Sequence, residues 1–112
     1  MLKIFRISHT EFVRLSKERG CRIHGTHFAL ATFPLPVGTQ GPKAACVVSK
    51  KVSLKAVTRN QIKRRCRECI RAHSSVLDTH RTYVFYAKKS SADTAFVDIR
   101  VDIDELIEKS NH

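Results

Sequence analysis

Residues 56–68 read Ala56-Val-Thr-Arg-Asn-Gln-Ile-Lys-Arg-Arg-Cys-Arg-Glu68 and form the densest part of a strongly basic stretch. Ten of the chain's 21 lysines and arginines fall between Lys43 and Arg71, and Glu68 is the one acid there. Ten cations less one acid leave +9 of the net charge of +11 in this stretch. Charge concentrated in this way repels itself, and its natural partner is a polyanion.

The same stretch has the period of an amphipathic helix. With Ile62 at the centre of one face, a step of about 100° per residue brings Cys66, Cys69 and Ile70 to that face, which predicts a core-facing stripe. The adjoining face holds Asn60, Lys63, Arg64, Arg67 and Arg71. A helix face that is merely solvated usually carries charges of both signs. This face carries positive charges alone, which predicts phosphate binding, and the forked guanidinium of arginine suits phosphate oxygens. Asn60 could instead help to cap the helix start.

Length and composition limit the number of domains, the class of partner and the location that the chain can have. A chain of 112 residues with 42% hydrophobic residues fits one domain over residues 1–112. A pI of about 10.0 favours nucleic acid over an anionic membrane surface as the partner. No apolar run approaches the ~20 residues of a membrane span, and the N-terminus lacks a secretory signal. We therefore expect a cytoplasmic protein whose four cysteines stay reduced.

Local patterns predict helices and strands on both sides of the basic helix. Ser8 and Glu11 form a capping box, with Ile7 and Phe12 placed as a hydrophobic staple, which predicts a helix over 8–20 ending at Gly20. Strands are expected over 23–33, 44–49 and 82–87, and a loop over 34–42. Residues 97–104 alternate like a strand, yet a helical stripe favours a helix over about 94–109. The predicted order is α-β-β-α-β-α.

Other constellations are more typical of a core than of a catalytic site. Cys66, Cys69 and His73 resemble a metal motif, but a second ligand pair at zinc spacing is missing and the cysteines lie on the core face. No hydrolytic arrangement or glycine-rich phosphate loop is present in the sequence. The aromatic residues suit a core, and one or two of them could stack on unpaired bases. These aromatics are Phe12, Phe28, Phe33, Tyr83, Phe85 and Tyr86.

Two motifs together resemble the protein subunit of bacterial ribonuclease P. They are the strand end Ser49-Lys-Lys51 and the run Ala56-Val-x-Arg59-Asn60-x-Ile62-Lys63-Arg64-x-x-Arg67-Glu68. The resemblance covers nearly the whole chain, and its spacing is far more specific than a single basic run. It implies an α+β fold, an α-β-β-β-α-β-α two-layer sandwich with a left-handed β-α-β crossover, contrary to the common hand. The additional strand would come from dividing residues 21–50.

The resemblance also implies a function. The partner would be a catalytic RNA that removes the 5′ leader of precursor tRNA by metal-assisted hydrolysis, with magnesium bound by the RNA. The polypeptide would hold no catalytic residue, no metal site and no tightly bound cofactor, and would use neither a membrane nor a small-molecule substrate. Phe12 and Phe28 would line a cleft for the single-stranded leader. With Arg71 from the cationic face, the RNA-binding residues would be Lys50, Lys51, Arg59, Asn60, Lys63, Arg64, Arg67 and Arg71.

Three positions depart from the family's pattern. Gln61 stands where arginine is typical, while Ser16 and Ala31 stand where aromatic residues are usual. The first change barely affects the contact with the catalytic RNA, and the other two leave less stacking surface in the leader cleft. Charge alone would equally fit a non-enzymatic protein that binds ribosomal or other structured RNA. A helix-turn-helix DNA-binding protein fits less well, because no convincing partner helix precedes the basic one.

Overall fold

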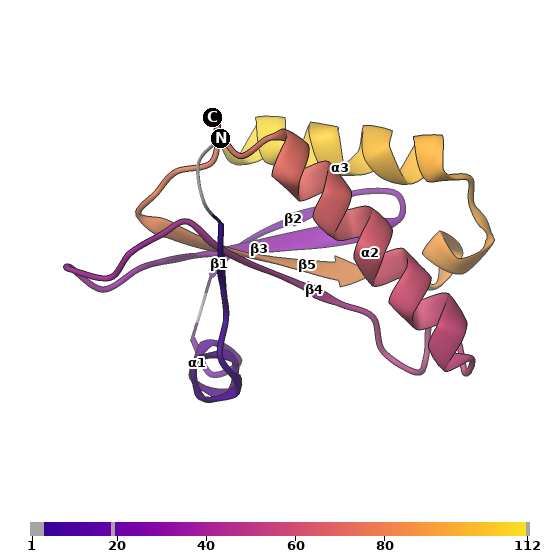
Figure 1. Ribbon diagram of the computed structural model, residues 1–112, viewed down its shortest axis with the longest axis horizontal. Helices are drawn as coiled ribbons and strands as arrows, with labels where there is room; N and C mark the ends of the chain where they lie inside the picture. The colour runs from indigo at the N-terminus through magenta and orange to yellow at the C-terminus, as the bar shows by residue number, and fades with distance from the viewer. Residues whose placement is uncertain (1–3, 19, 112) are drawn as a thin grey trace.

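A mixed five-stranded sheet organises the fold in the computed structural model, which describes residues 4–18 and 20–111 (Figure 1). The strand order is β1-β4-β5-β3-β2. Neighbours β1/β4 and β4/β5 are parallel, whereas β3/β5 and β2/β3 are antiparallel. The strands are β1 (Phe5–Arg6), β2 (Cys21–His24), β3 (Phe28–Pro34), β4 (Lys43–Val47) and β5 (Arg81–Ala87).

Helices cover the two faces of the sheet unequally. The long helices α2 (Ala56–Ala72) and α3 (Phe96–Ser110) lie over one face, and the short α1 (His9–Leu15) lies on the other (Figure 1). A 3₁₀ helix, η1 (Lys89–Asp93), leads from β5 toward α3. The predicted α+β sandwich and the strand and helix order over α1–α3 are confirmed. The crossover β4-α2-β5 joins parallel neighbours, and its left hand stays a prediction.

The main core lies between the sheet and the two long helices. Ile62, Cys66, Cys69 and Ile70, the predicted core stripe, are all buried there. Fully buried side chains from β3, β5 and α3 complete this core: Phe28, Leu30, Tyr83, Phe85, Ile99 and Ile103. A smaller cluster on the other face joins α1 to the sheet through Leu15, Ala31, Phe33 and Val84. This second face carries fewer apolar residues because α1 covers only one end of it (Figure 1).

A buried carboxylate connects α3 to the β2–β3 hairpin. Asp102, only 4% exposed, accepts hydrogen bonds from the backbone N–H groups of Thr26, His27 and Phe28 at 2.8–2.9 Å. The backbone also approaches closely, since a Cβ built at Gly25 would lie 2.6 Å from Asp102 Oδ1. Three charge-assisted bonds compensate for the removal of the carboxylate from water.

The structure corrects three expectations. The capping box at Ser8 and Glu11 is present, but the helix ends at Leu15 with Ser16 as its C-cap, so Gly20 is not the stop. The strand expected over 23–33 is a hairpin of β2 and β3, which supplies the additional strand. The edge strand β1 was not predicted. Among residues 4–18 and 20–111 no helix is long and apolar enough to cross a membrane.

Candidate nucleic-acid interface

The start of α2 is held by an arginine side chain. Lys55 is the N-cap and makes no side-chain capping bond. Arg59 Nη1 instead donates to the carbonyl oxygens of Ser53 and Leu54 at 2.9 and 3.0 Å, which joins the helix to the loop before it. Arg59 is half-buried. Its guanidinium therefore has a structural role, and its expected contact with RNA stays a prediction.

The predicted cationic face is otherwise directed to solvent. Asn60, Arg64, Arg67 and Arg71 are exposed, and Lys63 is half-buried. Within the part of the chain that the structure describes, none of these five makes an ion pair or a side-chain hydrogen bond. Such a face is a concentration of positive potential without an internal counter-charge. We call these five residues the α2 cationic face.

Two neighbouring parts of the basic stretch differ from this face. Arg65 points to another side of α2, where its guanidinium lies 5.6 Å from the centroid of the Phe96 ring at the start of α3. Lys50 and Lys51 are exposed in the turn after β4, which Val52 closes by donating its N–H to the carbonyl of Ser49 at 3.1 Å. The turn leads directly to α2, so the two lysines extend the positive surface beyond the N-terminal end of this helix.

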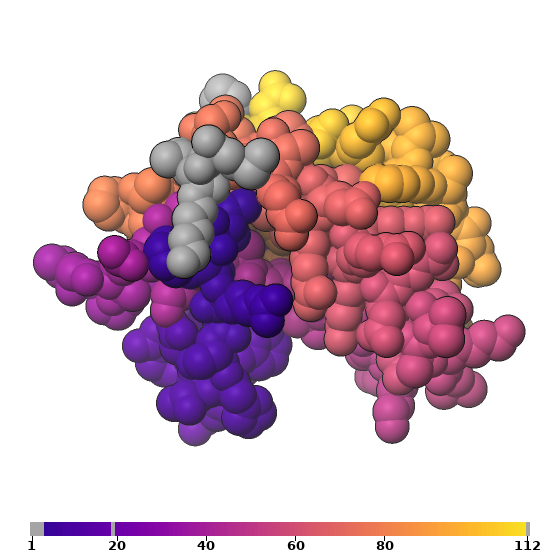
Figure 2. Space-filling model, viewed as in Figure 1, coloured from indigo at the N-terminus to yellow at the C-terminus, as the bar shows by residue number. Residues whose placement is uncertain are grey.

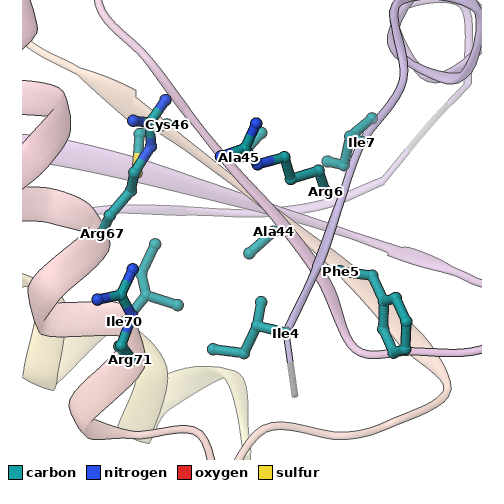
Figure 3. Close-up of a pocket in the computed structure, with 10 residues that line it drawn as sticks. All are labelled: Ile4, Phe5, Arg6, Ile7, Ala44, Ala45, Cys46, Arg67, Ile70 and Arg71. Atoms are coloured by element: carbon teal, nitrogen blue, oxygen red, sulfur yellow. The ribbon is translucent and has the colours of Figure 1, made fainter.

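A pocket lies between the N-terminal segment and α2. Its volume is about 350 Å³, and it is lined by residues 4–7, residues 44–46, Arg67, Ile70 and Arg71. We call it the β1–α2 pocket. Figure 2 shows the N-terminal segment and α2 side by side on the face toward the reader. In Figure 3 the side chains of Ile4, Ala44 and Ile70 point into the space, with arginines around it.

The second face of the sheet offers a different surface. Phe12 of α1 and Tyr86 of β5 are half-buried and pack against the small cluster. The guanidinium of the exposed Arg22 lies 5.1 Å from the centroid of the Tyr86 ring. Phe28, by contrast, is 0% exposed in the main core, so its expected place in a leader cleft is wrong. Its side chain lies in the core cluster with residues of α2 and α3, on the opposite face of the sheet from the small cluster.

Hydrogen bonding and burial shift the pKa of three further groups. Lys43 Nζ of β4 donates to Glu11 Oε2 of α1 at 2.5 Å, and this contact lowers the pKa of the Glu11 carboxyl below its ordinary value. Burial raises the pKa of the Cys69 thiol to about 11. Burial likewise raises the pKa of Cys66, whose Sγ accepts from Cys46 Sγ at 2.6 Å. The cysteines of α2 thus belong to the core, as predicted.

Sequence reasoning did not single out three residues of these surfaces. Tyr86 was one of six aromatic candidates, and period two could have selected it, since it alternates with the buried Phe85 along β5 and must face the second side. Arg22 lies in β2, which was not separated from β3. Arg6 carries no local signal, because only the pairing of β1 with β4, with Arg6 opposite Ala44, brings it beside α2.

Sequence comparisons identify a family and relatives of the chain. A family model described as Ribonuclease P matches residues 6–111. The chain is 37% identical over 84 residues to the "Ribonuclease P protein component" of Desulfovibrio desulfuricans, an alignment that covers 75% of this chain and 64% of that relative. It is 30% identical over 111 residues to the protein of the same description from Halalkalibacterium halodurans, covering 98% of this chain and 91% of the relative.

Solved structures agree with these matches. The RNase P protein of Staphylococcus aureus superposes with a TM-score of 0.82 at 25% identity, covering 96% of both chains. The RNase P protein from Thermotoga maritima gives a TM-score of 0.75 at 20% identity, covering 96% of this chain and 97% of that one. The second comparison supports the fold alone, and the two together place α2 and the sheet in a known architecture.

Proposed function

Because the chain belongs to the ribonuclease P protein family, we propose that it binds the catalytic RNA of ribonuclease P and assists 5′ maturation of tRNA. The observation that carries this assignment is the α2 cationic face, in which four of the five residues are exposed and none makes an ion pair within residues 4–18 and 20–111. The guanidinium group of arginine can donate two parallel hydrogen bonds to two oxygens of one phosphate. Lys50 and Lys51 extend the same surface, while Arg59 supports it by holding the loop.

We assign the hydrolytic chemistry to the RNA and its magnesium ions. The guanidinium and ammonium groups of the proposed interface bind phosphate and do not ligate magnesium. Magnesium prefers carboxylates, phosphates and water as ligands. The protein's contribution is to neutralise phosphate charge where RNA segments approach each other, which lowers the magnesium concentration that the RNA needs.

The second face of the sheet is the proposed site for the single-stranded leader of precursor tRNA. Phe12 and Tyr86 provide half-buried rings there, and Arg22 provides a cation over the Tyr86 ring. Aromatic rings with nearby arginine suit unpaired bases, because every base has a face that stacks. Phe33 lies in the same cluster but is 4% exposed, so stacking rests on the first two rings.

Cleavage of precursor tRNA by a bacterial ribonuclease P RNA at low magnesium tests the function. We expect the unaltered chain to raise the cleavage rate, and Arg67→Ala with Arg71→Ala to reduce that gain. The matched control removes two exposed cations from α3, Arg100→Ala with Lys109→Ala, and should keep the gain. If the unaltered chain leaves the rate unchanged, or if both pairs lose equally, the proposal does not stand.

A further inference from the structure

The β1–α2 pocket has two chemically different parts. Its floor is apolar, formed by Ile4, Ala44 and Ile70, and the ring of Phe5 points away from it (Figure 3). Its remaining lining includes the exposed arginines Arg6, Arg67 and Arg71. A volume of about 350 Å³ lies within the range of small-ligand sites. The pocket therefore suits an occupant that is part apolar and part anionic.

The three arginines meet without an acid between them. None of the lining residues is acidic, and within residues 4–18 and 20–111 none of the three arginines makes an ion pair or a side-chain hydrogen bond. They come from two elements, since Arg6 lies in β1 and Arg67 and Arg71 lie one turn apart on α2. Convergent cations of this kind repel one another, so a bound phosphate relieves that repulsion and forms forked hydrogen bonds.

A phosphate alone would leave the apolar floor in contact with water. A nucleobase adds a flat ring that packs on aliphatic side chains and on arginine planes. We propose that the pocket holds one unstacked nucleotide of the RNA partner, with its base against Ile4 and Ile70 and its phosphates at Arg67 and Arg71. This inference rests on the proposed function and adds a base-sized site to the phosphate-binding face.

Direct binding of small probes tests the pocket without the large RNA. We would titrate the full chain with adenosine 5′-monophosphate, adenosine and inorganic phosphate, and follow the methyl signals of Ile4, Ala44 and Ile70 by NMR. The monophosphate should shift all three and bind at least about tenfold more tightly than either half, because base stacking and phosphate contact combine. Equal binding of monophosphate and phosphate, with unmoved methyl signals, would overturn the nucleotide site.

Filling the pocket tests its role in RNA binding. Ala44→Leu occupies the floor and leaves every arginine in place, while Ala72→Leu adds the same atoms at the exposed end of α2. We expect about tenfold weaker binding of ribonuclease P RNA for the first and no change for the second. Ile4→Ala, which removes part of the floor beside a two-residue strand, should also weaken binding and serves if Ala44→Leu does not fold.

The outcomes separate the two proposals. If the folded pocket variants bind the RNA as tightly as the unaltered chain, the nucleotide pocket is refuted and the proposed function stands. If the unaltered chain does not bind the RNA, the proposed function fails, and the monophosphate titration still decides whether the pocket takes a nucleotide.

Discussion

The adjacent residues Arg64 and Arg65 offer a test that separates RNA binding from folding. Arg64 is exposed on the α2 cationic face and has no partner among the described residues. Arg65 is half-buried, and its guanidinium lies 5.6 Å from the Phe96 ring centroid. Replacing either residue by alanine removes one positive charge from the same helix. Differences between the two variants therefore report side-chain position and not net charge.

The expected magnitudes follow from these environments. A phosphate contact contributes about 0.7–0.9 to the slope of log K against log salt, so Arg64→Ala should reduce the slope by about that amount. Between about 50 and 200 mM salt this corresponds to a roughly threefold smaller loss of affinity. Arg65→Ala should keep the slope. It should instead lower the free energy of unfolding by about 0.5–1 kcal/mol through loss of the cation–π contact with Phe96.

Two measurements decide the comparison. Fluorescence anisotropy of labelled ribonuclease P RNA over a series of salt concentrations gives the slope, and urea unfolding of each variant gives the stability. Equal reduction of the slope in both variants would show that the affinity for RNA depends on the total charge of the protein and not on one face of α2. A larger loss of stability in Arg64→Ala than in Arg65→Ala would mean that the faces of the helix are wrongly assigned.

Three further predictions concern stability and cysteine chemistry. Asp102→Ala leaves three backbone N–H groups without their acceptor and should lower the free energy of unfolding by about 3 kcal/mol or more; a loss near zero in urea unfolding would contradict this. The Glu11–Lys43 contact lowers the pKa of Glu11. The contact should therefore contribute its full stabilisation above about pH 4.5, and this stabilisation should be lost as the pH falls through the lowered pKa of Glu11. The Glu11→Gln variant should lack the stabilisation at every pH. Iodoacetamide near pH 8 should label exposed Cys21 and spare Cys69, whose thiol pKa is raised to about 11; equal labelling of the native chain, followed by mass spectrometry, would exclude a buried Cys69.

Periodicity predicted α2 well because the helix has a sharp boundary between two kinds of side chain. The four residues of the core stripe are buried, and the α2 cationic face lies toward solvent or at its edge. A continuous amphipathic pattern of this length shows by itself which side of the helix is buried, so no tertiary information is required. The same logic placed β5 and α3 correctly, even though residues 97–104 also alternate like a strand.

The hairpin of β2 and β3 could not be read in the same way, because its turn depends on a distant residue. Residues 21–34 are rich in strand formers throughout, and Gly25 is the one local turn signal between the two strands. Its N–H groups at Thr26 and His27 are satisfied by Asp102, which lies 76 and 75 residues away in the chain. The end of α1 is a similar case, since the helix ends at Leu15, before the predicted stop at Gly20.

Arg59 shows that a motif residue can have a structural role beside the RNA contact that its family implies. A step of about 100° per residue puts Arg59 on the core side of the α2 cationic face, and the structure uses it to hold the carbonyl groups of Ser53 and Leu54. The loop that carries Lys50 and Lys51 is thereby connected to the first turn of α2. Arg59 therefore fixes the loop, and the exposed cations of the loop and of α2 form the positive surface that we propose for RNA binding.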